Sequence, residues 1–108
     1  MKVRQWEVWK SRPPGFERDH WFVIISPQER CDDPRHLLIN GLACFTLRGN
    51  PDPVEVRLNS ADGFQTATIC DCDFLYVLEK AKLHSTLGSV SWVRQQAIKA
   101  KMKEVFRL

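Results

Sequence analysis

Apolar and polar residues alternate in several short runs along the chain, with the two-residue period of half-buried β-strands. This period predicts strands over residues 3–9 and 54–58. β-Branched and small residues predict another strand over residues 65–72. Residues 75–90 are ambiguous, and within them residues 83–90 have the pattern of a last strand.

Two further runs are apolar at almost every position, which is typical of central strands. They cover residues 20–25 and 36–45. Asn40-Gly41 interrupts the second run and marks either a bulge or a close approach of two backbones within a long strand. The residues between the two runs, 26–35, are polar and include two prolines, and this composition predicts a loop.

The end of the chain has a different period. Residues 91–108 contain no glycine or proline, and Ser91 is a suitable N-cap for a helix over residues 92–106. Apolar residues recur there at spacings of three and four, which predicts one stripe facing a core; they are Val93, Ala97, Ile98, Met102, Val105 and Phe106. The expected fold is mainly β, a small barrel of about five to seven strands with a C-terminal helix.

Composition agrees with one folded domain spanning residues 1–108. The chain is 44% hydrophobic, which excludes a disordered protein, and no apolar run approaches the roughly 20 residues of a membrane span. The first residues do not resemble a signal peptide, so we expect a soluble, cytoplasmic protein. We expect the four cysteines to be buried free thiols rather than disulfides or zinc ligands; they are Cys31, Cys44, Cys70 and Cys72.

The net charge of +3 is concentrated at the C-terminus. In residues 91–108, five lysines and arginines oppose Glu104 alone, a local charge of +4. Such a segment either contacts phosphates or an acidic partner, or forms a solvated helix face.

Six short motifs, in order along nearly the whole chain, resemble those of the MazF/PemK/Kid family of bacterial toxins. They are Glu7-Val8-Trp9, Gly15-Phe16-Glu17, the Ser26-Pro27 that ends an apolar strand, Pro53-Val54-Glu55-Val56-Arg57-Leu58, Cys70-Asp71-Cys72 and Gly88-Ser89-Val90-Ser91. The resemblance implies an SH3-like barrel of the CcdB/PemK type. It also implies a metal-independent endoribonuclease without a cofactor, acting as the toxin of a type II toxin–antitoxin system.

The resemblance further implies three partners: single-stranded RNA, a cognate antitoxin with an acidic tail, and a second copy of the chain. Two alternatives stay open. One is a barrel without catalysis that acts as a binding module. The other is a topoisomerase poison like CcdB, although those relatives end in Trp-Gly-Ile and this chain ends in Val105-Phe106-Arg107-Leu108.

The resemblance places His20 where the family has a catalytic arginine, and matches Thr46 to a family threonine. Cleavage of RNA needs a base for the 2′-hydroxyl, a cation for the phosphate and an acid for the leaving oxygen. His20 can move protons near neutral pH, and Arg18 can hold the phosphate. Thr46 can bond a phosphate oxygen, and Asp71 matches a position proposed as a base in some relatives.

Three residues are candidates for binding RNA without taking part in the reaction. Phe16 can stack on a base, and Arg48 can contact a phosphate. Glu17 belongs to the same loop as Phe16, which in relatives forms the substrate groove. Simpler interpretations also exist, such as a structural His20 or an ion pair between Arg18 and its acidic neighbours. We expect most of the tryptophans, Trp6, Trp9, Trp21 and Trp92, to lie in the core.

Overall fold

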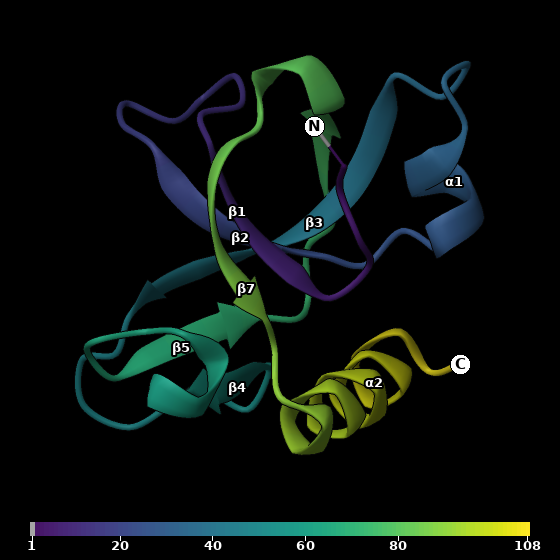
Figure 1. The fold of residues 1–108 in the computed structure, drawn as a ribbon. Helices are drawn as coiled ribbons and strands as arrows, with labels where there is room; N and C mark the ends of the chain where they lie inside the picture. The colour runs from purple at the N-terminus through teal and green to yellow at the C-terminus, as the bar shows by residue number, and fades with distance from the viewer. Residues whose placement is uncertain (1) are drawn as a thin grey trace.

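A computed structural model describes residues 2–108 (Figure 1). The strands are β1 (Glu7–Ser11), β2 (His20–Ile24), β3 (Leu38–Thr46), β4 (Glu55–Leu58), β5 (Thr68–Asp71), β6 (Tyr76–Glu79) and β7 (His84–Ser89). The helices are α1 (Gln28–Asp32) and α2 (Trp92–Phe106), with two 3-10 turns, η1 (Ser60–Asp62) and η2 (Lys80–Lys82). The mainly β fold with a C-terminal helix is therefore confirmed.

All strand pairs are antiparallel, in the order β4-β5-β3-β2-β1-β7. The long strand β3 also pairs with β6 through its first residues, Leu38–Gly41, while its last residues, Cys44–Thr46, pair with β5. One edge of β3 thus serves two partner strands, and the sheet wraps around itself.

At Gly41, β3 has no room for a side chain between its neighbours β2 and β6. A Cβ atom there would lie 2.8 Å from Cδ1 of Leu78 and 3.2 Å from Cβ of Phe22. Of the two interpretations of Asn40-Gly41, the close approach is therefore the correct one.

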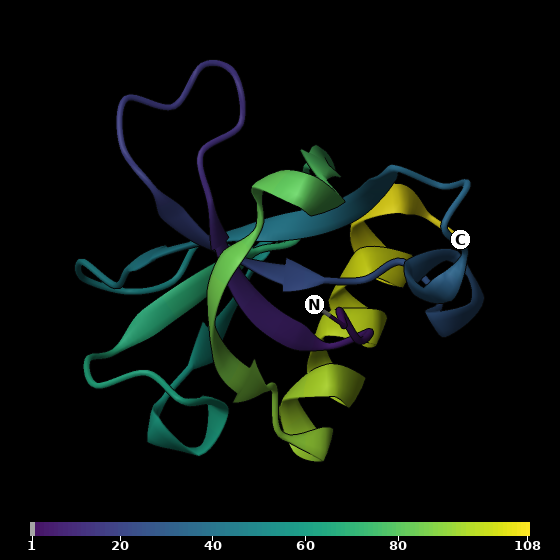
Figure 2. The same ribbon diagram turned by 45° about the horizontal axis from the view of Figure 1, so that its top comes forward.

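Successive residues of the strands point to opposite faces, so the sheet has a core on each side. Val8, Val23 and Leu42 belong to one core, which Ile98 of α2 completes. Trp9, Phe22 and Ala43 belong to the other. In Figures 1 and 2, α2 lies at the end of the molecule opposite the loop of residues 12–19.

Two differences from the predicted elements lie near the N-terminus, in the first strand and in the loop after the second. The first strand begins at Glu7 rather than at residue 3, because Trp6 has a left-handed φ of 73°. The N–H of Trp6 donates to the carbonyl of Ile24 and its carbonyl accepts from Val90, which holds this bend. The predicted loop 26–35 contains the short helix α1, which the sequence analysis missed.

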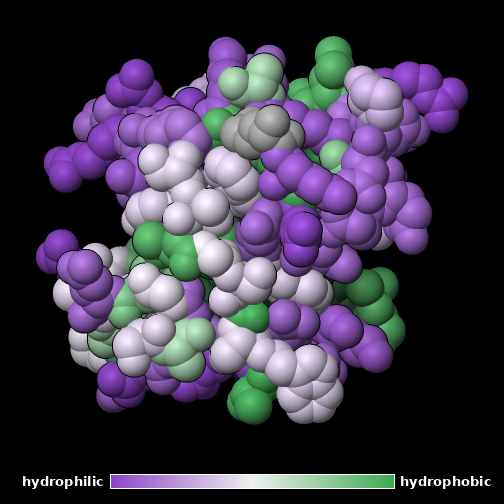
Figure 3. Space-filling view, viewed as in Figure 1, coloured by the Kyte–Doolittle hydropathy of each residue, from purple (hydrophilic) through white to green (hydrophobic). Residues whose placement is uncertain are grey.

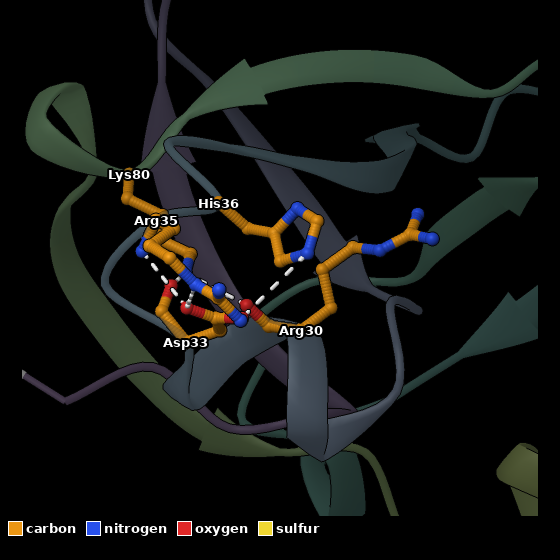
Figure 4. A network of polar contacts seen from close by, with 5 residues as sticks. All are labelled: Arg30, Asp33, Arg35, His36 and Lys80. Carbon is orange, nitrogen blue, oxygen red and sulfur yellow. Dashed lines mark hydrogen bonds and ion pairs between the residues drawn. The ribbon is translucent and has the colours of Figure 1, made fainter.

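The helix α1 is held by Lys80 of η2 (Figure 4). The Lys80 ammonium donates to the carbonyl of Arg30 at 2.7 Å and to that of Asp33 at 3.0 Å, at the end where a helix attracts cations. Hydrogen bonds from the side chain and backbone of Arg35 lower the pKa of Asp33 below its usual value. The Arg30 guanidinium points away from this network.

The apolar stripe predicted on α2 is only partly correct. Ile98 is fully buried, and Ala97 and Met102 pack beside it. Val93 is 68% exposed and Phe106 40%, because the helix buries a single narrow face against the barrel. Trp92 is 70% exposed, so its expected place in the core is wrong.

Ser91 precedes α2 as predicted, but its hydroxyl does not cap the helix. Its N–H and its hydroxyl both donate to Oδ1 of Asp62, each at 2.8 Å. The N–H of Asn59 donates to Oδ2 of the same carboxylate at 2.9 Å. Asp62 is fully buried. The two bonds from Ser91 join η1 to the start of α2, and the bond from Asn59 caps η1 itself.

We expect Asp62→Ala to lower the free energy of unfolding by about 3 kcal/mol, because it removes the acceptor of three part-buried hydrogen bonds from Asn59 and Ser91. Chemical denaturation measures the effect. The control is Glu104→Ala, which removes one exposed ion pair with Lys101 and should change stability by less than about 1 kcal/mol. Equal stability of the two variants would contradict this role for Asp62.

Candidate nucleic-acid interface

A cavity of about 810 Å³ opens where β2 begins and β3 ends. Its walls are the residues before and at the start of β2, the end of β3, and the segment that leads from η1 to β5. The lining residues are Arg18, Asp19, His20, Trp21, Cys44, Phe45, Thr46, Arg48, Gly63, Phe64, Gln65, Thr66, Thr68 and Leu87. This volume accommodates a ligand of nucleotide size or larger.

The pairing of β2 with β3 brings four predicted site residues to this cavity. Trp21 is the register partner of Cys44, so the antiparallel strands place the start of β2 beside the end of β3. His20 and Thr46 lie at these two ends, and Arg18 and Arg48 lie two residues beyond each of them.

Aromatic rings surround the half-buried His20. Its ring centroid lies 4.8 Å from that of Phe16 and 5.3 Å from that of Phe45. Phe16 also packs against Phe22 and Tyr76. Phe16 is therefore not among the residues that line the cavity, and its ring supports the imidazole.

The acidic residue at the cavity, Asp19, does not pair with the adjacent Arg18. Asp19 lies 3.3 Å from Nε2 of His84 and 4.0 Å from Nε of Arg12. Within residues 2–108, the Arg18 and Arg48 side chains form neither an ion pair nor a hydrogen bond. The cavity thus combines two available guanidinium groups with an imidazole and a hydroxyl, a set that suits a phosphodiester.

The segment of residues 63–68 contributes cavity residues that the sequence analysis missed. The predicted strand 65–72 placed Gln65 and Thr66 inside the sheet, but β5 begins only at Thr68. Both side chains are exposed at the cavity wall. The only indication in the sequence was that these two polar residues stand ahead of the β-branched run that forms β5.

Trp21 also lines the cavity, although it was expected in the core. It is partly buried against the first core, and the ammonium of Lys10 lies 4.8 Å from its ring centroid. The ammonium is attracted electrostatically to the negative face of the ring, and this contact helps to hold Trp21 in place.

Besides Phe16, two further predicted site residues lie away from the cavity lining. Glu17 is exposed in the loop before β2. Asp71 is at the end of β5, where it is the register partner of Glu55. Burial, together with a hydrogen bond to the Asp73 side chain, raises the pKa of Asp71 from 3.8 to about 6.

The described residues contain no group of His, Cys, Asp or Glu side chains placed to hold a metal ion. All four cysteines are buried and unpaired. In the chain from residue 2 to 108, no helix has the length and apolar character needed to cross a membrane. On the face drawn in Figure 3, hydrophilic side chains predominate and apolar ones form small separate areas.

Comparisons with known proteins identify the fold. Neither a protein-family model nor a curated protein matches the chain. Among solved structures, an endoribonuclease in complex with its cognate antitoxin, from a mycobacterial species, is 20% identical with a TM-score of 0.81. The match covers 98% of this chain and 96% of that one.

Two other structures are similar. The Mycobacterium tuberculosis toxin MazF-mt6 has a TM-score of 0.78 at 14% identity, covering 94% of this chain and 97% of its own. A MazE–MazF structure from Deinococcus radiodurans has a TM-score of 0.76 at 13% identity, covering 98% and 96%. The chain therefore has the MazF fold, as the sequence motifs predicted.

The raised pKa of Asp71 predicts a pH-dependent stability. The folded protein keeps the carboxyl proton up to about pH 6, whereas the unfolded chain releases it near 3.8. The free energy of unfolding of the native protein should therefore fall as the pH rises from 3.8 to about 6. We expect Asp71→Asn, which is neutral throughout, to gain stability relative to the native protein over this range.

Thermal unfolding at a series of pH values measures the difference. Asp52→Asn is the control, because Asp52 is exposed in the connection from β3 to β4 and its side chain makes no contact that the substitution would break. A stability difference between Asp71→Asn and the native protein that does not change with pH would show that the carboxyl is not perturbed.

Proposed function

We propose that this protein is an endoribonuclease toxin of a type II toxin–antitoxin system, acting on single-stranded RNA without a metal ion. The observation that carries the proposal is the cavity in which His20, Thr46, Arg18 and Arg48 meet. The fold supports the proposal, because the similar solved structures include an endoribonuclease with its cognate antitoxin and a MazE–MazF structure.

The side chains suggest how the reaction proceeds. The 2′-oxygen attacks the neighbouring phosphorus, which forms a cyclic phosphate and breaks the bond to the 5′-oxygen of the next nucleotide. Solvent water protonates this leaving oxygen. His20 accepts the proton of the 2′-hydroxyl, because an imidazole exchanges protons near neutral pH. Arg18 and Arg48 balance the charge that develops on the phosphate, and the Thr46 hydroxyl donates to one of its oxygens.

The local structure prepares His20 for this role. The Phe16 and Phe45 rings restrict the imidazole, and the pairing of Trp21 with Cys44 fixes its backbone. Asp71 is outside the cavity lining, so we assign no proton transfer to it.

We further propose a cytoplasmic protein that forms a homodimer and is neutralised by an antitoxin with an acidic tail. The support for an antitoxin is that similar structures include a complex with a cognate antitoxin. Exposed apolar side chains offer surfaces for partners; they include Leu37, Leu38 and Val77 beside β3, and Trp92, Val93 and Leu108 on or after α2.

We expect His20→Ala to lower the rate of RNA cleavage about 100-fold, the range that general acid–base catalysis supplies. Cleavage of a long mixed-sequence RNA, with a metal chelator present, measures it. Arg18→Ala should also cause a large loss. His36→Ala is the matched control, because His36 is exposed and lies beside Asp33, away from the cavity.

His20→Arg separates two roles for this position. A guanidinium supplies charge but exchanges no proton near neutral pH, so we expect this variant to stay slow. Cleavage by His20→Arg at the native rate would show that the position needs only a cation. Native rates for both His20→Ala and Arg18→Ala, with folding confirmed by circular dichroism, would contradict the assigned site.

Expression of the protein without an antitoxin should arrest bacterial growth, and total RNA from these cells should show new 5′ ends. Expression of His20→Ala to the same soluble level is the control and should allow growth. Arrest with intact RNA and with cleaved DNA would instead identify a topoisomerase poison.

A further inference from the structure

A second cavity, of about 380 Å³, adjoins the first one. Phe64, Gln65 and Thr66 line both cavities, so this segment forms a common wall. The other residues of the second cavity are Arg57, Asn59, Ser60, Ala67 and Arg94. A chain molecule that leaves the first cavity across this wall enters the second.

Two arginines from distant parts of the sequence meet in the second cavity. Arg57 is exposed on β4, and Arg94 lies in the first turns of α2, which packs against β4. In the part of the chain that the structure describes, neither guanidinium has an ion-pair or hydrogen-bond partner.

The buried carboxylate of Asp62 does not neutralise these arginines. The Asp62 carboxylate is occupied by Ser91 and Asn59. Two guanidinium groups on one cavity without a carboxylate favour an anion that presents several oxygens. The folded chain thus leaves an anion-binding position beside the candidate catalytic cavity.

The common wall suits a nucleic acid strand. Gln65 and Thr66 are exposed there and offer an amide and a hydroxyl, which can bond base edges or phosphate oxygens. Along the path, the guanidinium groups of Arg18 and Arg48 come first and those of Arg57 and Arg94 last. Such spaced cations follow the backbone of a single strand.

We propose that the second cavity binds a backbone phosphate of the same RNA strand that occupies the first cavity. Arg57 and Arg94 hold this phosphate, and Gln65 and Thr66 guide the strand between the two cavities. The inference rests on the proposed function, because it assigns RNA to the first cavity. It means that the protein engages nucleotides well away from the bond that is cleaved.

The test compares binding of a short and a long RNA. Both are 2′-O-methyl oligoribonucleotides, of about 4 and about 16 nucleotides, so that binding is measured without cleavage. Fluorescence anisotropy gives their affinities for the native protein, Arg57→Gln and Arg94→Gln over a series of salt concentrations. Arg30→Gln is the matched control, since Arg30 is exposed on α1 and lines neither cavity.

We expect Arg57→Gln and Arg94→Gln each to weaken binding of the long RNA about tenfold and to leave the short RNA unaffected. Each lost phosphate contact should also reduce the salt slope by about 0.7. Arg30→Gln should bind both RNAs as the native protein does. Equal weakening of both lengths, or no weakening of the long one, would overturn the proposal.

Failure of the inference and failure of the proposed function are distinguishable. If the protein binds the long RNA in this length-dependent way but cleaves none, the second cavity is confirmed and the catalytic assignment fails. If the native protein cleaves RNA while both arginine variants bind it normally, only the inference fails. Binding of an acidic peptide that depends on Arg57 and Arg94, without such dependence for RNA, would assign the cavity to a protein partner.

Discussion

The register of β3 against its three neighbours is the constraint on which the site depends. β3 pairs with β2 on one edge and with β6 and β5 on the other, and Gly41 lets β2 and β6 approach the strand closely. A shift by one residue would turn every side chain of the strand to the opposite face. His20 and Thr46 would then no longer share a cavity.

The strands that form the barrel centre were predictable because their apolar runs are continuous. The apolar period of α2 also predicted its bounds, 92–106, but only some of the side chains that it assigned to the buried face pack against the barrel. The candidate site residues were predicted from the family resemblance and not from the hydrophobic period, since nothing in the sequence around His20 or Thr46 indicates that the two residues lie close together. Their meeting depends on the pairing of two strands separated by α1 and its flanking loops.

Other features could not be read from the sequence because distant groups determine them. Backbone hydrogen bonds to Ile24 and Val90 hold the bend at Trp6. The ammonium of Lys80 holds the end of α1 through a hydrogen bond to the carbonyl of Arg30. Residues 63–67 form the cavity wall because β5 begins only at Thr68. The sequence did not indicate this, since the β-branched and small residues predicted a strand from residue 65. In each case the local sequence allows several structures and a tertiary contact selects one.

The bonds of Asp62 have a consequence for synthesis of the chain. A ribosome releases the N-terminal residues first, and β1, β2 and β3 are complete long before residue 91 is made. The carboxylate that anchors η1 takes two of its three donors from Ser91, just after β7. The cavity wall next to η1 is therefore completed late, and a nascent chain carries His20 and Thr46 before it carries the finished site.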